Sequence, residues 1–157
     1  MSHKDCIGHW KDEVQVDQYT VKLSGLFHGP EWLSSRNKMT GSGIYLDKSW
    51  KRVLRAKAGA YIVDWPDRKA IPVEQIHQII LKVHGILVKK NTVEIACLGG
   101  HGRTGTLLAC LLVYMEGLHP RQAIQEVWKR HCHNAIETLD QRLAVYAYNQ
   151  YLEAGRN

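Results

Sequence analysis

The chain has 157 residues, enough for one domain that buries its own core, and we treat residues 1–157 as a single domain. Its formal charge of +6 and isoelectric point near 9.2 favour an anionic partner, but nucleic acid, phospholipid and phosphoprotein all stay open. The longest apolar run, residues 107–115, is less than half of the roughly 20 residues that a membrane-spanning helix needs. We therefore expect a soluble protein with no transmembrane segment.

The four cysteines are widely spaced and form no C-x-x-C pair: Cys6, Cys97, Cys110 and Cys132. This usage is typical of a reduced protein rather than of a disulfide framework, so we expect a cytoplasmic location. His9 near Cys6 and the His-Cys-His sequence at 131–133 suggest zinc ligands, but no pair has the spacing of a structural zinc site, and only folding could unite them. We therefore expect neither a metal nor another cofactor.

Along the chain, four short runs rich in β-branched and aromatic residues predict strands over 19–25, 43–46, 60–63 and 92–98. Before the last of them, residues 72–90 place five apolar side chains on one helical face: Ile76, Ile79, Ile80, Val83 and Leu87. Three more helices are predicted over 104–116, 120–131 with Pro120 at its start, and 138–152 with Thr138 as N-cap. The fold class is therefore α/β, with a central mixed sheet flanked by helices.

The last predicted strand turns directly into a helix over a glycine-rich bend. Such a bend leaves the first N–H groups of the helix unpaired, and they point into a small space where the helix dipole favours an anion. Gly100, Gly102 and Gly105 spell the dinucleotide pattern G-x-G-x-x-G, but only helices follow, where that fold needs another strand. The Walker A pattern also fails, because Thr106 stands where its lysine is required.

A third phosphate-binding pattern accounts for the whole bend: Cys97, five residues, Arg103 and Thr104. A thiolate at Cys97 can attack phosphorus, while Arg103 holds phosphate oxygens with its planar fork. The Thr104 hydroxyl is expected to hydrogen-bond the sulfur and help it leave. The intervening residues are expected to bind phosphate through their amides: Leu98, Gly99, Gly100, His101 and Gly102. Taken singly, Cys97 would more often be an inert core cysteine and Arg103 a surface charge.

Displacing an alkoxide or phenoxide from phosphorus requires a proton donor, placed on a loop that can close over the phosphate. Residues 64–72 form such a segment, stiffened by two prolines after a predicted strand. Asp67, thirty residues before Cys97, is the expected donor, and Asp64 is the alternative. Alone, the segment also fits an ordinary turn.

Together these segments resemble the cysteine-dependent protein tyrosine phosphatase and dual-specificity phosphatase superfamily. Residues 97–105 are similar to its signature loop and residues 65–67 to its mobile acid loop. The resemblance covers residues 44–152 as a phosphatase-like core, whereas residues 1–43 stay unassigned. It implies a strand, phosphate-binding loop and helix active site. It also implies two-step catalysis through a cysteinyl-phosphate, in which Asp67 acts first as acid and then as base, with no metal.

The resemblance also implies that Gln141, in the sequence AIETLDQ, orients the hydrolytic water, although an ordinary exposed helical glutamine is an equal alternative. One departure is Ala96, which stands where the family usually places a histidine before the nucleophile. We expect this change to slow the reaction or loosen the loop rather than to alter the chemistry.

The cues on substrate class disagree. The Trp-Pro-Asp sequence resembles tyrosine-specific members, whereas the compact length resembles dual-specificity and lipid-directed ones. We expect His101 to point toward the mouth of the loop, where a basic residue resembles phosphoinositide phosphatases. The basic segment 48–57 could recruit acidic lipid or RNA, but a solvated amphipathic face is favoured. Arg68 and Lys69, beside Asp67, are better placed to meet substrate phosphate.

The predicted function is a phosphomonoester hydrolase, foremost a protein tyrosine or dual-specificity phosphatase whose partner is a phosphorylated protein. One alternative is a phosphatase of phosphoinositides or RNA 5′-phosphates. A catalytically weak, phosphate-binding pseudophosphatase is an alternative of another class. No stable complex with nucleic acid is expected.

Overall fold

The computed structural model of the protein describes residues 6, 10–26, 43–54 and 59–156. Within them a five-stranded sheet has the order β1-β2-β5-β3-β4. The strands are β1 (Glu13–Val16), β2 (Tyr19–Gly25), β3 (Gly43–Tyr45), β4 (Ala60–Ile62) and β5 (Thr92–Cys97). β1 pairs antiparallel with β2, and every other pairing is parallel, so the predicted mixed sheet is confirmed.

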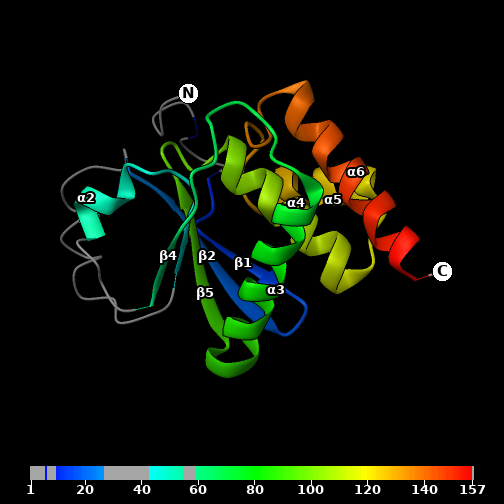
Figure 1. Cartoon of the computed structure of the whole chain (residues 1–157), viewed down its shortest axis with the longest axis horizontal. Coiled ribbons are helices and arrows are strands. Elements are labelled where there is room, and N and C mark those ends of the chain that lie inside the picture. Colours follow the sequence, from blue (N-terminus) through cyan, green and yellow to red (C-terminus); the bar gives the residue numbers. More distant parts are fainter. Residues whose placement is uncertain (1–5, 7–9, 27–42, 55–58, 157) are drawn as a thin grey trace.

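Four helices cover one side of the sheet, and a short one lies on the other side (Figure 1). The four are α3 (Val73–Lys90), α4 (Gly102–Glu116), α5 (Pro120–Arg130) and α6 (Leu139–Gly155), and the short one is α2 (Trp50–Leu54). The main core lies between the sheet and the four helices. A smaller cluster of Tyr45, Trp50, Leu54 and Ala96 packs beneath α2.

Local signals in the sequence place most of these elements correctly. The buried residues of α3 are the five predicted ones. Pro120 is the first residue of α5, and Thr138 caps α6 by accepting a hydrogen bond from the amide of Gln141 at 3.2 Å. Cys110 is fully buried in α4, and burial raises the pKa of its thiol, as suits a core cysteine.

Two elements were not predicted. β1 alternates exposed and buried residues but has only four of them, and it gains its stability from pairing with β2. The second is α2, which lies inside the basic segment. Trp50 and Leu54 of α2 are buried while Lys51 and Arg52 are exposed, so the amphipathic interpretation is confirmed for this helix.

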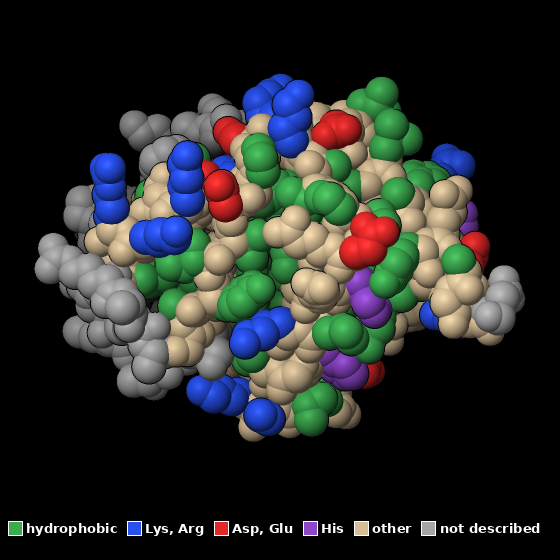
Figure 2. All heavy atoms as spheres, viewed as in Figure 1, with side chains coloured by type: hydrophobic (Ala, Val, Ile, Leu, Met, Phe, Trp, Pro, Cys, Tyr) green, Lys and Arg blue, Asp and Glu red, His purple; other side chains and the backbone are tan. Residues whose placement is uncertain are grey.

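Figure 2 shows Lys and Arg side chains gathered over the α2 end of this face. Lys48, Lys51 and Arg52 are exposed there, whereas Arg55 and Lys57 lie outside the described residues. Within the described ranges, no helix combines the length and the apolar character needed to span a bilayer.

The parallel pairing brings the carboxyl ends of four strands, β2, β5, β3 and β4, to one edge of the sheet. β5 lies between β2 and β3, with Cys97 opposite Gly25 and Ala96 opposite Tyr45. Only a hydrogen fits at Gly25, because a Cβ there would lie 2.5 Å from the Leu98 carbonyl oxygen. The segment after β5 therefore rests directly on the end of β2. Ligands of open α/β sheets bind at this edge.

Candidate active site

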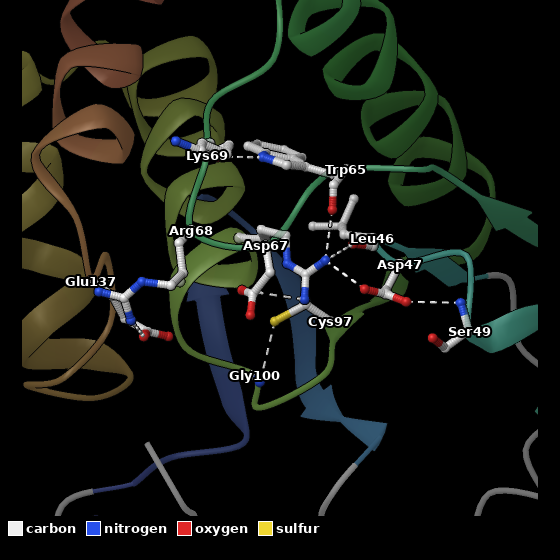
Figure 3. Close-up of polar contacts among 12 residues, drawn as sticks. Leu46, Asp47, Ser49, Trp65, Asp67, Arg68, Lys69, Cys97, Gly100 and Glu137 are labelled. Carbon is white, nitrogen blue, oxygen red and sulfur yellow. Dashed lines mark hydrogen bonds and ion pairs between the residues drawn. The ribbon is translucent and has the colours of Figure 1, made fainter.

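Cys97 ends β5 and is 2% exposed. The chain then turns sharply at Gly100, whose φ of +77° lies in the left-handed region that favours glycine. This turn aims the Gly100 amide back at the Cys97 sulfur, 3.2 Å away (Figure 3). Helix α4 begins two residues later, so the sulfur faces the amino end of a helix. An inward-pointing N–H group and a helix amino terminus both suit an anion bound in this turn.

Arg103, in the first turn of α4, is 1% exposed. Its Nη1 donates to the carbonyl oxygens of Leu46 at 3.0 Å and Trp65 at 2.6 Å, and to Oδ2 of Asp47 at 2.7 Å. Its Nη2 lies 3.5 Å from Oδ1 of Asp67. Its Nε is buried and has no hydrogen-bond partner within the described residues. Nη1 is thus anchored by three acceptors, whereas Nε is available to an anion.

Asp47, just after β3, is a site residue that the sequence did not reveal. Its Oδ1 accepts from the Ser49 amide at 2.8 Å. Burial alone would raise the pKa of Asp47, but hydrogen bonds from Ser49 and from the Arg103 guanidinium hold it below its usual value. Asp47 therefore stays anionic and balances the buried charge of Arg103. The sequence feature that could have indicated its role is its position just after a predicted strand, since β3 pairs with β5.

The segment 64–72 brings Asp67 to Arg103. Trp65 is fully buried, and its indole N–H donates to the Lys69 carbonyl at 2.7 Å, which closes the segment into a tight loop. Asp67 stays 62% exposed and points toward Cys97 and Arg103 (Figure 3). Within the described residues, Asp67 and Asp47 are the carboxylates that pair with Arg103, and Asp64 is not among them.

This acid loop is fastened to the start of α6. The Thr138 hydroxyl donates to the Arg68 carbonyl at 3.0 Å, and the Ala70 amide donates to Oδ2 of Asp140 at 2.6 Å. The Arg68 guanidinium lies 3.5 Å from a carboxylate oxygen of Glu137. Arg68 is therefore held toward α6 here, while Lys69 is exposed.

Gln141 is fully buried, so the alternative of an exposed helical glutamine is wrong. Its Oε1 accepts from the amides of Glu137 at 2.9 Å and Thr138 at 3.3 Å. Its Nε2 has no partner within the described ranges, and a Cβ at Gly102 would lie 2.8 Å from that atom. Gln141 therefore borders the start of α4 with a free amide N–H₂.

Thr104 is also fully buried at this end of α4. Its hydroxyl has no hydrogen-bond partner in the described part of the chain, so the expected bond to the Cys97 sulfur is not formed in this structure.

The His101 side chain does not point toward the mouth of the loop, contrary to expectation. It is fully buried, with Nε2 2.9 Å from the Cys6 sulfur and its ring edge-on to Trp10. Cys6 and Trp10, which precede β1, cover this side of the loop, and their position could not be inferred from local sequence. The Cys6 sulfur also lies 3.2 Å from that of Cys132, so folding brings together two of the cysteines considered above as zinc ligands. His9 lies outside the described residues.

Two further side chains brace the loop from behind, and neither was predicted. The Trp50 indole N–H donates to the Cys97 carbonyl at 3.1 Å. His131 lies with Nε2 2.9 Å from the Gly100 carbonyl oxygen and Nδ1 2.7 Å from that of Lys11. The imidazole therefore links the backbone of residues 97–103 to the chain before β1.

Solved structures show the same architecture. The structure described as Tk-PTP in the active form superimposes with a TM-score of 0.73 at 22% identity, over 90% of this chain and 98% of that one. Residues 46–146 match the family model PTP-SAK, described as Swiss Army Knife protein, DSP-PTPase phosphatase domain. The chain therefore belongs to this family of phosphatase domains.

Two relatives extend the comparison. An uncharacterized protein of Methanocaldococcus jannaschii is 27% identical, over 96% of this chain and 95% of its own length. Protein tyrosine phosphatase domain-containing protein 1 of Mus musculus is 33% identical over 64% of this chain, but the match covers only 14% of that longer protein. The similarity is thus to one domain of the mouse protein.

Proposed function

We propose that the protein hydrolyses phosphomonoesters through a cysteinyl-phosphate on Cys97, and that its substrates are phosphorylated proteins, foremost at tyrosine. Membership of the DSP-PTPase family supports the phosphatase chemistry. The gathering of a sulfur, a buried guanidinium and an exposed carboxylate around one loop supports this particular mechanism.

In the first step the Cys97 thiolate attacks phosphorus, and the bond from phosphorus to the leaving oxygen breaks. The amides of residues 98–102 and the Arg103 fork hold the other phosphate oxygens, so charge is balanced where it develops. Asp67 gives its proton to the leaving oxygen, which departs as a neutral alcohol or phenol.

In the second step a water molecule attacks the cysteinyl-phosphate, and the sulfur–phosphorus bond breaks. Asp67, now a carboxylate, takes the proton of that water, and inorganic phosphate leaves. The buried N–H₂ of Gln141 beside Gly102 is suited to orient the water. We assign the Thr104 hydroxyl, which has no other partner in the described residues, to the sulfur as it leaves.

The arrangement of Arg103 is the observation that carries the proposal. A buried N–H without a partner costs about 1–3 kcal/mol, and a phosphate oxygen against Nε would remove that cost. Asp67 lies 3.5 Å from Nη2 of the same guanidinium. The group that would hold phosphate and the group that would protonate the leaving oxygen therefore share one space.

The burial of His101 bears on the substrate class. The phosphoinositide alternative drew on the compact length of the chain and on a basic side chain at the mouth, and the second of these cues fails because His101 is turned into the interior. A phosphoprotein substrate is therefore favoured. Lys69, exposed next to Asp67, is the basic residue best placed to meet it.

The test is turnover on a panel of phosphotyrosine and phosphoserine peptides, a phosphoinositide and a 5′-phosphorylated RNA. We expect phosphotyrosine to be preferred, and Cys97→Ser to lower turnover at least about 1,000-fold. Cys110→Ala, a buried cysteine away from the loop, is the matched control. Acid quenching during turnover should leave phosphate on the peptide that carries Cys97. Equal rates for the wild type and Cys97→Ser would instead indicate a pseudophosphatase.

A further inference from the structure

A second cluster of reactive side chains lies behind the phosphate loop, and the proposed reaction does not use it. It consists of Cys6, His101 and Cys132, each fully buried. The Cys6 sulfur lies 2.9 Å from His101 Nε2 and 3.2 Å from the Cys132 sulfur, and the three atoms all lie within 4.8 Å of one another. These residues come from three separate segments of the chain.

Two thiols and an imidazole are the donor set that Zn²⁺ prefers in proteins. Zinc bonds of about 2.3 Å to sulfur and 2.0–2.1 Å to nitrogen, arranged tetrahedrally, place ligand atoms roughly 3.6–3.8 Å apart. The two contacts at Cys6 would therefore widen by roughly 0.6–0.7 Å, and the distance between the Cys132 sulfur and His101 Nε2 would shorten by at most about 1.2 Å. A disulfide between the two sulfurs would use two of the three groups and would give the converging imidazole no role.

Amide N–H groups point at both sulfurs. The Asn134 backbone amide points at the Cys132 sulfur at 3.4 Å, and the Asn134 side-chain amide points at the Cys6 sulfur at 3.5 Å. N–H donors of this kind stabilise thiolates and fix the orientation of metal ligands. Trp10 packs edge-on against His101 and shields the cluster on that side.

We propose that Cys6, His101 and Cys132 bind one Zn²⁺ ion. Binding deprotonates the two thiols, whose protons pass to solvent, and leaves one tetrahedral position for a further ligand. The ion joins the amino-terminal segment and the connection between α5 and α6 to the phosphate loop through His101. Its role is to hold the loop in shape rather than to take part in the reaction. Zinc binding at this cluster does not depend on the proposed phosphatase activity.

The experiment measures metal binding by the full chain, stripped with EDTA and kept reduced with a phosphine. Titration with Zn²⁺ against a chromogenic chelator should give one equivalent, and saturation about 1,000-fold above the dissociation constant should raise the melting temperature by roughly 10 °C. Co²⁺ in place of Zn²⁺ should give the visible spectrum of a tetrahedral site with sulfur-to-metal charge transfer.

Variants locate the site. Cys6→Ala and Cys132→Ala should each weaken Zn²⁺ binding at least about 100-fold and remove roughly half of the charge-transfer intensity. Cys97→Ser and Cys110→Ala should bind the metal as the wild type does. Metal binding that survives in Cys6→Ala, or that is lost in Cys97→Ser, overturns the proposal.

Two outcomes with the unmutated chain also overturn the proposal, so the test does not depend on a variant that folds. One is the lack of any stoichiometric Zn²⁺ or Co²⁺ binding by the reduced protein. The other is purified protein that carries a disulfide between Cys6 and Cys132 by non-reducing peptide mapping and takes up no metal after reduction.

Discussion

The phosphate loop and the acid loop meet at Arg103 but are held in opposite ways. In the phosphate loop Cys97, His101 and Arg103 are at most 2% exposed, and side chains from α2 and from the chain after α5 brace its backbone. In the acid loop only Trp65 is fully buried, and Asp67 is 62% exposed. Cys97, the proposed nucleophile, is thus fixed by the core, whereas Asp67, the proposed acid, is placed by a few contacts at the surface.

This difference suits the two tasks. A thiolate and a phosphate cradle act best when they are rigid before the substrate arrives, because no reorganisation is then needed at the moment of reaction. A loop that protonates a leaving group must also open to admit substrate. We therefore expect substitutions around the phosphate loop to change the rate through altered packing. The effect of substitutions in the acid loop should instead depend on the leaving group of the substrate.

The largest effect is expected from Asp67→Asn, which removes the acid and keeps the shape. The value of kcat on phenyl phosphate should fall about 100- to 1,000-fold, because phenoxide is a poor leaving group without a proton. The fall on para-nitrophenyl phosphate should be much smaller. Asp64→Asn is the matched control and should change neither rate. Equal losses on both substrates would argue against Asp67 as the acid.

Asp47→Asn tests how Arg103 is anchored. Loss of the charged partner at 2.7 Å leaves Nη1 held by two neutral carbonyl oxygens and should lower kcat/KM about 10-fold or more, because small displacements of a positioned group are costly. Glu116→Gln, which breaks the pair with Arg130 away from the site, is the control and should leave kcat/KM unchanged. Comparable activity losses in both variants would mean that general destabilisation explains the effect.

Trp50→Phe removes the indole donor to the Cys97 carbonyl and keeps most of the ring packing. We expect kcat to fall about 5-fold, in line with the roughly 1–3 kcal/mol that a buried unpaired carbonyl costs. Trp128→Phe loses a similar bond, to the Ala135 carbonyl, and should affect the melting temperature more than the rate. Unchanged kcat in Trp50→Phe would show that this brace is not needed.

The contact between the acid loop and α6 should have a smaller effect. Asp140→Ala removes the acceptor of the Ala70 amide, and we expect kcat to change about 2- to 3-fold while the phosphate affinity stays constant. Asp140→Asn retains an oxygen acceptor and should restore most of the rate. Failure of that rescue would indicate that the charge at the start of α6 matters instead.

Asp47 should make the folded protein sensitive to acid. Its pKa is lowered in the folded protein below 3.8, so its contribution to stability is complete above that pH and is lost as the pH falls through the lowered value. Melting temperatures of the wild type should therefore drop more steeply than those of Asp47→Asn between pH 4 and pH 2.5. Parallel curves for the two proteins would contradict this account.

The features that were predicted correctly from the sequence are those that depend on residues close together in the chain. The spacing of Cys97 and Arg103, the cap at Thr138 and the apolar face of α3 are all local, and each is found where it was expected. Asp47 reaches Arg103 only because β3 pairs with β5. Such a pairing is set by the whole sheet, and no short window of sequence contains it.

The same limit explains the other failures. His101 was expected at the mouth because the loop alone leaves it exposed, and the covering segment lies 95 residues earlier. Cys6 and Cys132 are 126 residues apart, so their spacing carries no ligand pattern. Gln141 turned inward because α6 packs against α4, which its helical sequence did not indicate.

The close fit at Gly25 means that the end of β2 can influence the position of Cys97 through the backbone of residues 98–100. A single methyl group added there would displace the loop backbone, because it would meet the Leu98 oxygen at 2.5 Å and the Gly100 nitrogen at 2.7 Å. An inhibitor that acted there would not need to compete with substrate for the charged site around Arg103. A group that pushed on the loop from the end of β2 would displace the Cys97 sulfur and leave every reacting group chemically unchanged.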